Sequence, residues 1–254
     1  MNRRCARAVM VIAAMLLAEF CAFAQSAAGQ GSQAGGVKAL PFLSPIFGDN
    51  MVLQRGKADA IWGWAEPGES VRVEIGERVA TGVAGPDRRW QLQIEPPATG
   101  GPYTVRISGH ETVELHNVMV GDVWLCGGQS NMELPLRFTK NADEEIKAAN
   151  YPEIRFFTVN GHPAYHHVDV IEGKWQPVSP ETASWVSAVA YYFARRVQKD
   201  IRIPIGLVVD AVGGTPAESW TSEAALRPLH DFDVPLAKLD RLKSENAPEY
   251  GNYV

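Results

Sequence analysis

The stretch at residues 120–136, VGDVWLCGGQSNMELPL, constrains the fold more than any other part of the chain. Its first seven residues are an apolar run with β-branched and aromatic side chains, which predicts a buried strand at 120–126. Gly127 and Gly128 follow, and glycine readily adopts the positive φ angles of a sharp turn. Ser130 therefore stands just beyond the carboxyl end of a strand, where open α/β sheets place their chemistry. We predict that Ser130 is a nucleophile.

Predicted strands and helices alternate in the rest of the chain after Ser130. Residues 154–159 and 205–209 are short apolar, β-branched runs, and residues 184–197 place apolar side chains on one face at helical spacing. This alternation predicts a parallel sheet with right-handed crossovers and with helices on both faces. We therefore assign residues 118–254 to an α/β domain.

Weaker signals fill the gaps between these segments. A short helix is expected to start at Asn141, which would cap it with Glu144 at the capping-box position. Another short helix is expected at 221–227. Residues 161–173 are interpreted as a loop and 175–180 as irregular, and the polar stretch from residue 230 onward is left unassigned.

Residues 40–117 have a different pattern, in which short strand-like segments about ten residues apart alternate with Gly- and Pro-rich turns. This spacing predicts a small all-β, sandwich-like domain. Trp62 and Trp64 could form a stacking platform for a carbohydrate, but core packing is the favoured interpretation.

The N-terminus is typical of an exported protein. Arginines at positions 3, 4 and 7 precede an apolar stretch and an Ala-Phe-Ala cleavage pattern, so residues 1–24 are interpreted as a signal peptide rather than a membrane anchor. Residues 25–39 have the composition of a flexible leader. We expect a periplasmic or extracellular protein without a membrane span, whose mature form keeps a single cysteine, Cys126.

Charge and side-chain inventory exclude several classes of function. The net charge of −5 is negative, whereas proteins that bind nucleic acid typically have a basic surface, so nucleic-acid binding is not expected. Cys126 lies inside the predicted strand and is interpreted as packing rather than as a nucleophile. The pattern of His162, His166 and His167 resembles a metal site only superficially, so no metal or other cofactor is expected.

A serine hydroxyl becomes a good nucleophile when a base accepts its proton and donors receive the developing oxyanion. The backbone N–H of Ser130 is one candidate donor. The second is the N–H of Gly213 or Gly214, in a turn after the strand at 205–209, although that turn could also be purely structural. Gln129 and Asn131 are candidates for binding substrate, for orienting Ser130 or for capping the turn.

Met132 stands where the α/β-hydrolase elbow G-x-S-x-G has its second glycine. The chain instead resembles the sialate O-acetylesterase branch of the SGNH (GDSL-like) hydrolases. The motifs that carry the resemblance, in the family's order, are NMVLQ at 50–54, IWG at 61–63, PG at 67–68, GDVWLCGGQSNM at 121–132, SAVAYYFAR at 187–195 and PIGLVVDAVGGTPAESW at 204–220.

The resemblance implies a flavodoxin-like α/β fold and a secreted esterase that removes acetyl groups from sugars. It implies a serine nucleophile, an acyl-enzyme and an oxyanion-hole glycine in the second turn. It also places Glu218 near the sugar pocket, although a capping role for Glu218 remains equally open.

The family also has a W-x-Q-G-E-x-N block and a D-x-x-H pair, and neither pattern occurs in these 254 residues. We therefore expect the chain to correspond to an N-terminal portion of such an esterase, with a truncated hydrolase domain. Two alternatives remain open at this stage. One is a non-catalytic, secreted carbohydrate-binding protein, and the other is a deacetylase of xylan or another polysaccharide.

Overall fold

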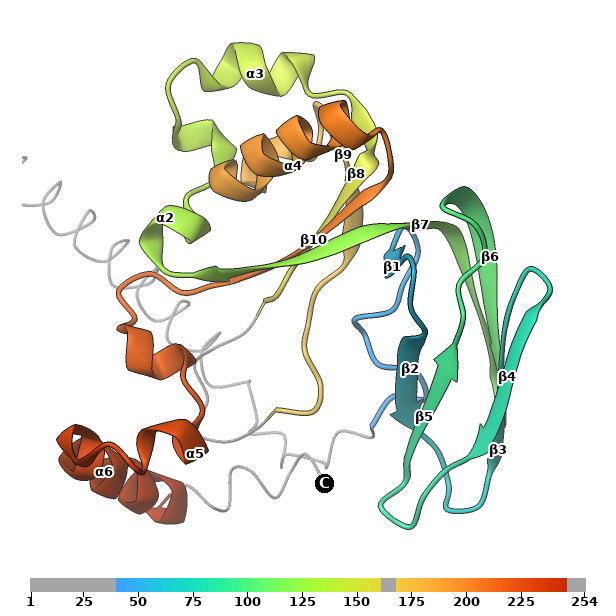
Figure 1. The fold of residues 1–254 in the computed structure, drawn as a ribbon, viewed down its shortest axis with the longest axis horizontal. Coiled ribbons are helices and arrows are strands. Elements are labelled where there is room, and N and C mark those ends of the chain that lie inside the picture. The colour runs from blue at the N-terminus through green and yellow to red at the C-terminus, as the bar shows by residue number, and fades with distance from the viewer. Residues whose placement is uncertain (1–39, 161–167, 246–254) are drawn as a thin grey trace, which may run out of the picture. The chain divides into compact units, whose positions relative to one another are not determined.

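The computed structural model describes residues 40–160 and 168–245 (Figure 1). The predicted signal peptide and leader lie outside these residues, as do His162, His166 and His167. Among the described residues, no helix is both long enough and apolar enough to cross a membrane.

The N-terminal part is built from two layers of short strands. One layer has the order β4-β3-β6-β7, with β1 paired to β7, and the second layer is the pair β2-β5. The strands are β1 (Val52–Gln54), β2 (Asp59–Trp64), β3 (Ser70–Ile75), β4 (Arg78–Val83), β5 (Arg89–Ile94), β6 (Gly100–Ser108) and β7 (Thr112–Gly128).

Alternating burial creates the core of this part, as the sequence predicts. In β3 and β5 every second side chain is buried, and these side chains meet between the two layers. Trp64 is only 6% exposed. Trp62 packs edge-on against Phe47 with the ring centroids 4.6 Å apart. The structure therefore favours the core-packing interpretation of both tryptophans.

The strand β7 joins the two halves of the chain. It is 17 residues long and runs through the boundary predicted between residues 117 and 118. Met119, Val120 and Gly121 pair with β1, and the stretch from Asp122 to Gly128 pairs with β10 (Ile205–Ala211). One continuous strand thus carries Ser130 on a direct extension of the β-rich part.

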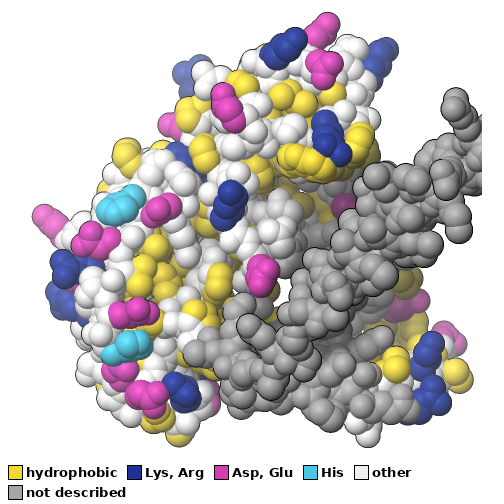
Figure 2. Space-filling view, turned by 180° about the vertical axis from the view of Figure 1, so that it is seen from behind, with side chains coloured by type: hydrophobic (Ala, Val, Ile, Leu, Met, Phe, Trp, Pro, Cys, Tyr) yellow, Lys and Arg dark blue, Asp and Glu magenta, His cyan; other side chains and the backbone are white. Residues whose placement is uncertain are grey.

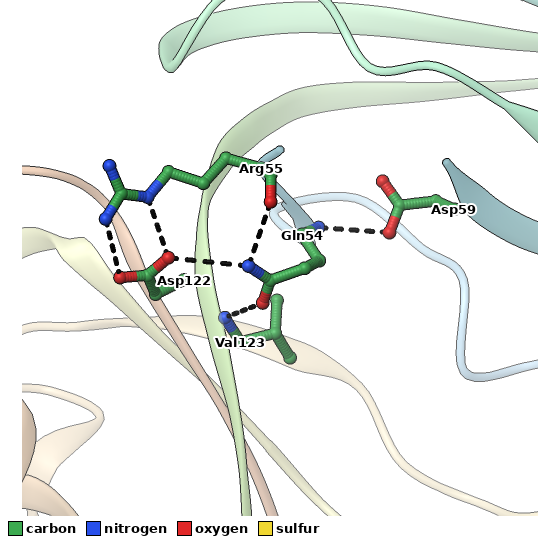
Figure 3. Close-up of polar contacts among 5 residues, drawn as sticks. All are labelled: Gln54, Arg55, Asp59, Asp122 and Val123. Carbon is green, nitrogen blue, oxygen red and sulfur yellow. Dashed lines mark hydrogen bonds and ion pairs between the residues drawn. The ribbon is translucent and has the colours of Figure 1, made fainter. Parts of the chain in front are cut away.

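Polar contacts hold β7 where it passes from one set of partners to the other (Figure 3). The backbone N–H of Val123 donates to Gln54 Oε1 at 2.9 Å, and Arg55 forms an ion pair with Asp122 at 2.8 Å. The backbone N–H of Gln54 donates to Asp59 Oδ1 at 3.2 Å. This network ties the loop after β1 to the start of the β7 segment that pairs with β10.

The second half of the sheet is parallel, as predicted, and the α/β fold class is confirmed. Its order is β7-β10-β8, with β8 at Tyr151–Thr158, and β9 (Trp175–Val178) adds an antiparallel edge. The helix α4 (Ala188–Ile201) packs its buried side chains against β8 and β10. α3 (Ala142–Ala148) lies on the same side of the sheet (Figure 1).

Within the described residues, the opposite face of this part of the sheet packs against the β-rich part rather than against helices. Phe157, Val208 and Trp175 belong to the core cluster of the β-rich part, and the Trp175 indole N–H donates to the carbonyl of Ile46 at 2.7 Å. A pocket of about 380 Å³ remains beside them, lined by Asp59 and Leu125 among others. The predicted cover of helices on both faces is thus observed on one face of the described part.

Three local predictions were wrong. Trp175–Val178 is a strand rather than an irregular segment, because it pairs with β8 at the sheet edge. Asn141 has a φ of 58° and makes no side-chain cap, so it enters α3 through left-handed backbone geometry instead. The helix predicted from residue 184 begins at Ala188, because the hydroxyl of Ser187 accepts a bond from the Ala190 N–H and caps it.

Two α-helices follow β10 within the described residues. α5 (Glu223–Leu226) is capped by Ser222. α6 (Asp233–Glu245) occupies the polar stretch that the sequence left unassigned.

Candidate active site

The two glycine turns meet at one edge of the parallel sheet. In the pairing of β7 with β10, Gly127 lies opposite Asp210 and Gly128 lies opposite Ala211. The strands therefore end side by side, and the N–H of Val212 donates to the carbonyl of Gly128 at 3.1 Å. Two segments about 80 residues apart are thus held together by backbone hydrogen bonds.

The first turn places Ser130 at the start of a single helical turn, α2 (Ser130–Glu133). Gly128 has a φ of 151°, within the range that L side chains rarely adopt, which explains the glycine at this position. The carbonyl of Gln129 accepts from the N–H groups of Met132 and Glu133 at 2.8 and 2.9 Å. The Gln129 carbonyl therefore begins the helical turn that carries the exposed Ser130.

The α2 turn is anchored to the helix layer. The N–H of Ala188, at the start of α4, donates to the carbonyl of Leu134 at 2.9 Å, and Leu136 N–H donates to the carbonyl of Val186 at 2.9 Å. Leu136 is fully buried. The position of Ser130 is therefore set by the packing of α4 as well as by β7.

The side chain of Gln129 lies on Ser130 and on the second turn. Its carboxamide oxygen Oε1 accepts from Ser130 Oγ at 2.6 Å, from the Ser130 N–H at 3.1 Å and from the Gly214 N–H at 3.3 Å. Three donors from both turns therefore converge on one oxygen atom.

The N–H of Gly213 has another partner. It donates to the carboxylate of Glu133 at 2.7 Å. A Cβ atom at Gly213 would lie 2.5 Å from Glu133 Oε2 and 3.7 Å from Ser130 Oγ, so this position must be glycine for the carboxylate to approach. Sequence reasoning missed Glu133, although its spacing of three residues from Ser130 puts both on neighbouring positions of a helical turn.

The second turn is stabilised by its own side chains. Gly214 has a φ of 81°, and Thr215 Oγ1 donates to the carbonyl of Val212 at 2.7 Å. The indole N–H of Trp220 donates to Thr215 Oγ1 at 2.8 Å. Glu218 lies exposed in the adjacent 3-10 helix Ala217–Trp220, and Asn131 is exposed in α2.

Cys126 and the described His230 do not form part of this site. Cys126 is 7% exposed, and burial raises the pKa of its thiol, which disfavours the reactive thiolate. His230 is exposed and faces Asp233, with Nδ1 and Oδ2 3.4 Å apart. Within residues 40–160 and 168–245 no group of three His, Cys, Asp or Glu side chains could hold a metal ion.

Comparison with known proteins relates the region around both glycine turns to a family. Residues 120–238 match the model of the family described as carbohydrate esterase, sialic acid-specific acetylesterase. The chain thus contains a region of the sialic acid-specific acetylesterase family. The resemblance inferred from the sequence motifs is therefore confirmed, and the matched region begins in β7 and includes both glycine turns.

Mammalian sialate O-acetylesterases are similar to this chain over most of its length. The sialate O-acetylesterases of Rattus norvegicus and Homo sapiens are 34% and 31% identical over 198 and 200 residues, each covering 70% of this chain. The chain spans 36% and 38% of the length of these two relatives. The crystal structure of a carbohydrate acetylesterase from Xanthomonas citri superposes with a TM-score of 0.70 at 33% identity, covering 74% of this chain and 44% of that one.

Proposed function

We propose that this chain acts in an exported serine esterase that removes O-acetyl groups from sialic acid or a related carbohydrate. Ser130 is the nucleophile in this proposal. The observation that carries it is the exposed Ser130 at the point where two glycine turns bring backbone N–H groups together. The match of residues 120–238 to the sialic acid-specific acetylesterase family supports the substrate class, and the N-terminal leader pattern supports export.

In the proposed reaction, Ser130 Oγ attacks the carbon of the acetyl carbonyl. The carbonyl oxygen becomes an oxyanion, and it accepts hydrogen bonds from the Ser130 N–H and from a glycine N–H of the second turn. Each such donor lowers the barrier by about 3 to 4 kcal/mol. The sugar hydroxyl leaves, an acetyl-enzyme remains, and water releases acetate from it. No metal or organic cofactor takes part in these steps.

Attack by Ser130 also requires a proton acceptor. Among the described residues, the hydroxyl of Ser130 donates to Gln129 rather than to a histidine or a carboxylate. The family resemblance implies an acid–base pair in a D-x-x-H motif, which does not occur in this sequence. The activity is therefore best tested in the longest natural reading frame that contains these 254 residues.

The experiment compares that protein with its Ser130→Ala variant. Acetate release from O-acetylated sialic acid is measured at matched protein concentrations, with unfolding curves to verify that both proteins fold. We expect the variant to lose at least about 1,000-fold in kcat/KM, because removing a covalent nucleophile leaves only binding and oxyanion stabilisation. Acetate release that persists in Ser130→Ala would refute the proposal.

The substrate defines the second candidate function. A deacetylase of xylan or another polysaccharide would use the same residues. The similar protein from Xanthomonas citri is a carbohydrate acetylesterase, which favours neither sugar. Parallel assays on acetylated xylan and on O-acetylated sialic acid distinguish the two. Carbohydrate binding without catalysis receives little support from the tryptophans, because Trp64 is buried.

A further inference from the structure

The carbonyl oxygen of the Gln129 side chain occupies a position that has the properties of an oxyanion site. Two backbone N–H groups, from Ser130 and Gly214, point at it from different turns of the chain. The hydroxyl of Ser130 is 2.6 Å from the same atom. Oxyanion sites have this composition, with convergent backbone donors directly beside the nucleophile.

The Gln129 carboxamide oxygen resembles the carbonyl oxygen of an ester substrate as a hydrogen-bond acceptor. A carboxamide oxygen and an ester carbonyl oxygen are both sp² acceptors with two lone pairs. Gln129 Oε1 therefore uses the donors that the carbonyl oxygen of an ester would need. The Gly213 N–H does not contribute to this position, because it is bonded to Glu133.

The Gln129 side chain is able to leave this position. Gln129 and Ser130 are both exposed, so the carboxamide can exchange its protein donors for water. The backbone bonds of α2 do not depend on the side chain, since the Gln129 carbonyl accepts from Met132 and Glu133, and Leu134 N–H donates to the Ser130 carbonyl.

We propose that Gln129 is a resident occupant of the oxyanion position, and that an ester must displace its carboxamide before Ser130 can react. This inference rests on the proposed role of Ser130 and adds a residue that controls access to it. It assigns Gly214, rather than Gly213, as the glycine of the second turn that faces the displaced oxygen.

The test measures how fast Ser130 is phosphonylated by an alkyl fluorophosphonate in the natural reading frame that contains this chain. The reagent forms a bond from Ser130 Oγ to phosphorus and releases fluoride, and its phosphoryl oxygen needs the same donors as an ester oxygen. Gln129→Ala empties the position, and we expect labelling about fivefold faster than in the wild type. Gln129→Glu supplies a charged acceptor that the donors bind more strongly, and we expect labelling about tenfold slower.

Two controls accompany these variants. Gln91→Glu makes the same substitution at an exposed position of β5 and should leave the rate unchanged. Urea unfolding verifies that each protein is folded. Peptide mapping by mass spectrometry locates the label on Ser130.

The outcomes separate the two proposals. Equal labelling rates in the wild type, Gln129→Ala and Gln129→Glu would refute the occupant role while leaving Ser130 as the nucleophile. Slower labelling in a folded Gln129→Ala would also refute it, because Gln129 would then assist the reaction. No label on Ser130 in any variant would refute the proposed nucleophile itself. A crystal structure of the labelled protein should show the phosphoryl oxygen bonded to the N–H groups of Ser130 and Gly214, with the Gln129 side chain displaced.

Discussion

The carboxylate of Glu133 accepts a hydrogen bond from the backbone N–H of Gly213 at 2.7 Å, across a separation of 80 residues in the sequence. This contact joins the helical turn that carries Ser130 to the glycine turn after β10. Gly214 is the next residue in the same turn. Glu133 therefore affects the site by holding the backbone of this turn in position. We interpret it as a positioning residue.

Removal of this contact should loosen the second turn. We expect Glu133→Ala to lower kcat for acetate release about fivefold to tenfold, which corresponds to about one hydrogen bond, with little change in KM. Glu133→Gln keeps an acceptor and should recover most of the loss. Glu144→Ala removes an exposed carboxylate from α3 and serves as the control. Equal kinetics in Glu133→Ala and Glu144→Ala would contradict the positioning role.

The two glycines of the second turn should respond differently to alanine. At Gly213 a Cβ atom would displace the Glu133 carboxylate, so Gly213→Ala should reduce activity at least as much as Glu133→Ala while changing stability little. Gly214 has open space but a φ of 81°, so Gly214→Ala should cost about 1 kcal/mol of unfolding free energy through backbone strain. Urea unfolding and acetate release measured on both variants test this, and the opposite assignment of effects would contradict it.

Two glycines within β7 provide a matched test of the fold. A Cβ atom at Gly121 would lie far inside the van der Waals contact distance to the backbone carbonyl oxygen of Pro204, which side-chain movement cannot relieve. We expect Gly121→Ala to lower the unfolding free energy by about 3 kcal/mol. At Gly127 the nearest backbone atom would be 3.7 Å away, so Gly127→Ala should cost less than about 1 kcal/mol. Similar unfolding midpoints for the two variants would show that the junction of β7 with β10 is looser than described.

Asp59 should make the junction sensitive to pH. Burial raises the pKa of its carboxyl to about 6, and its Oδ2 atom is buried without a hydrogen-bond partner among the described residues. An unfolded aspartate has a pKa of about 3.9. Between about pH 4 and pH 6 the folded state therefore binds more protons than the unfolded state, and this contribution to stability falls as the pH rises.

The variant Asp59→Asn isolates this effect, because asparagine can still accept the bond from Gln54. The shift corresponds to almost 3 kcal/mol, which partial exposure of the side chain reduces to about 1 to 2 kcal/mol. We expect the unfolding free energy of Asp59→Asn relative to the wild type to increase by that amount between pH 4 and pH 7.5. A difference that stays constant over this range in urea unfolding would refute the prediction.

Local sequence patterns were sufficient for much of this protein. The alternation in β3 and β5, the apolar runs of β8 and β10 and the glycine turn before Ser130 follow from side-chain periodicity and from the φ angles that glycine permits. These are properties of neighbouring residues. The position of Ser130 at the end of a parallel strand could therefore be predicted, together with the family that its motifs resemble.

Contacts between distant segments were decided only by the tertiary structure. Trp175–Val178 is a strand because β8 offers it an edge, and Asn141 adopts positive φ where it enters α3. Gly213 and Gly214 are adjacent, yet the Gly213 N–H points at Glu133 and the Gly214 N–H points at Gln129. No local pattern encodes that direction, because it is set by the register between β7 and β10 and by a carboxylate from another turn.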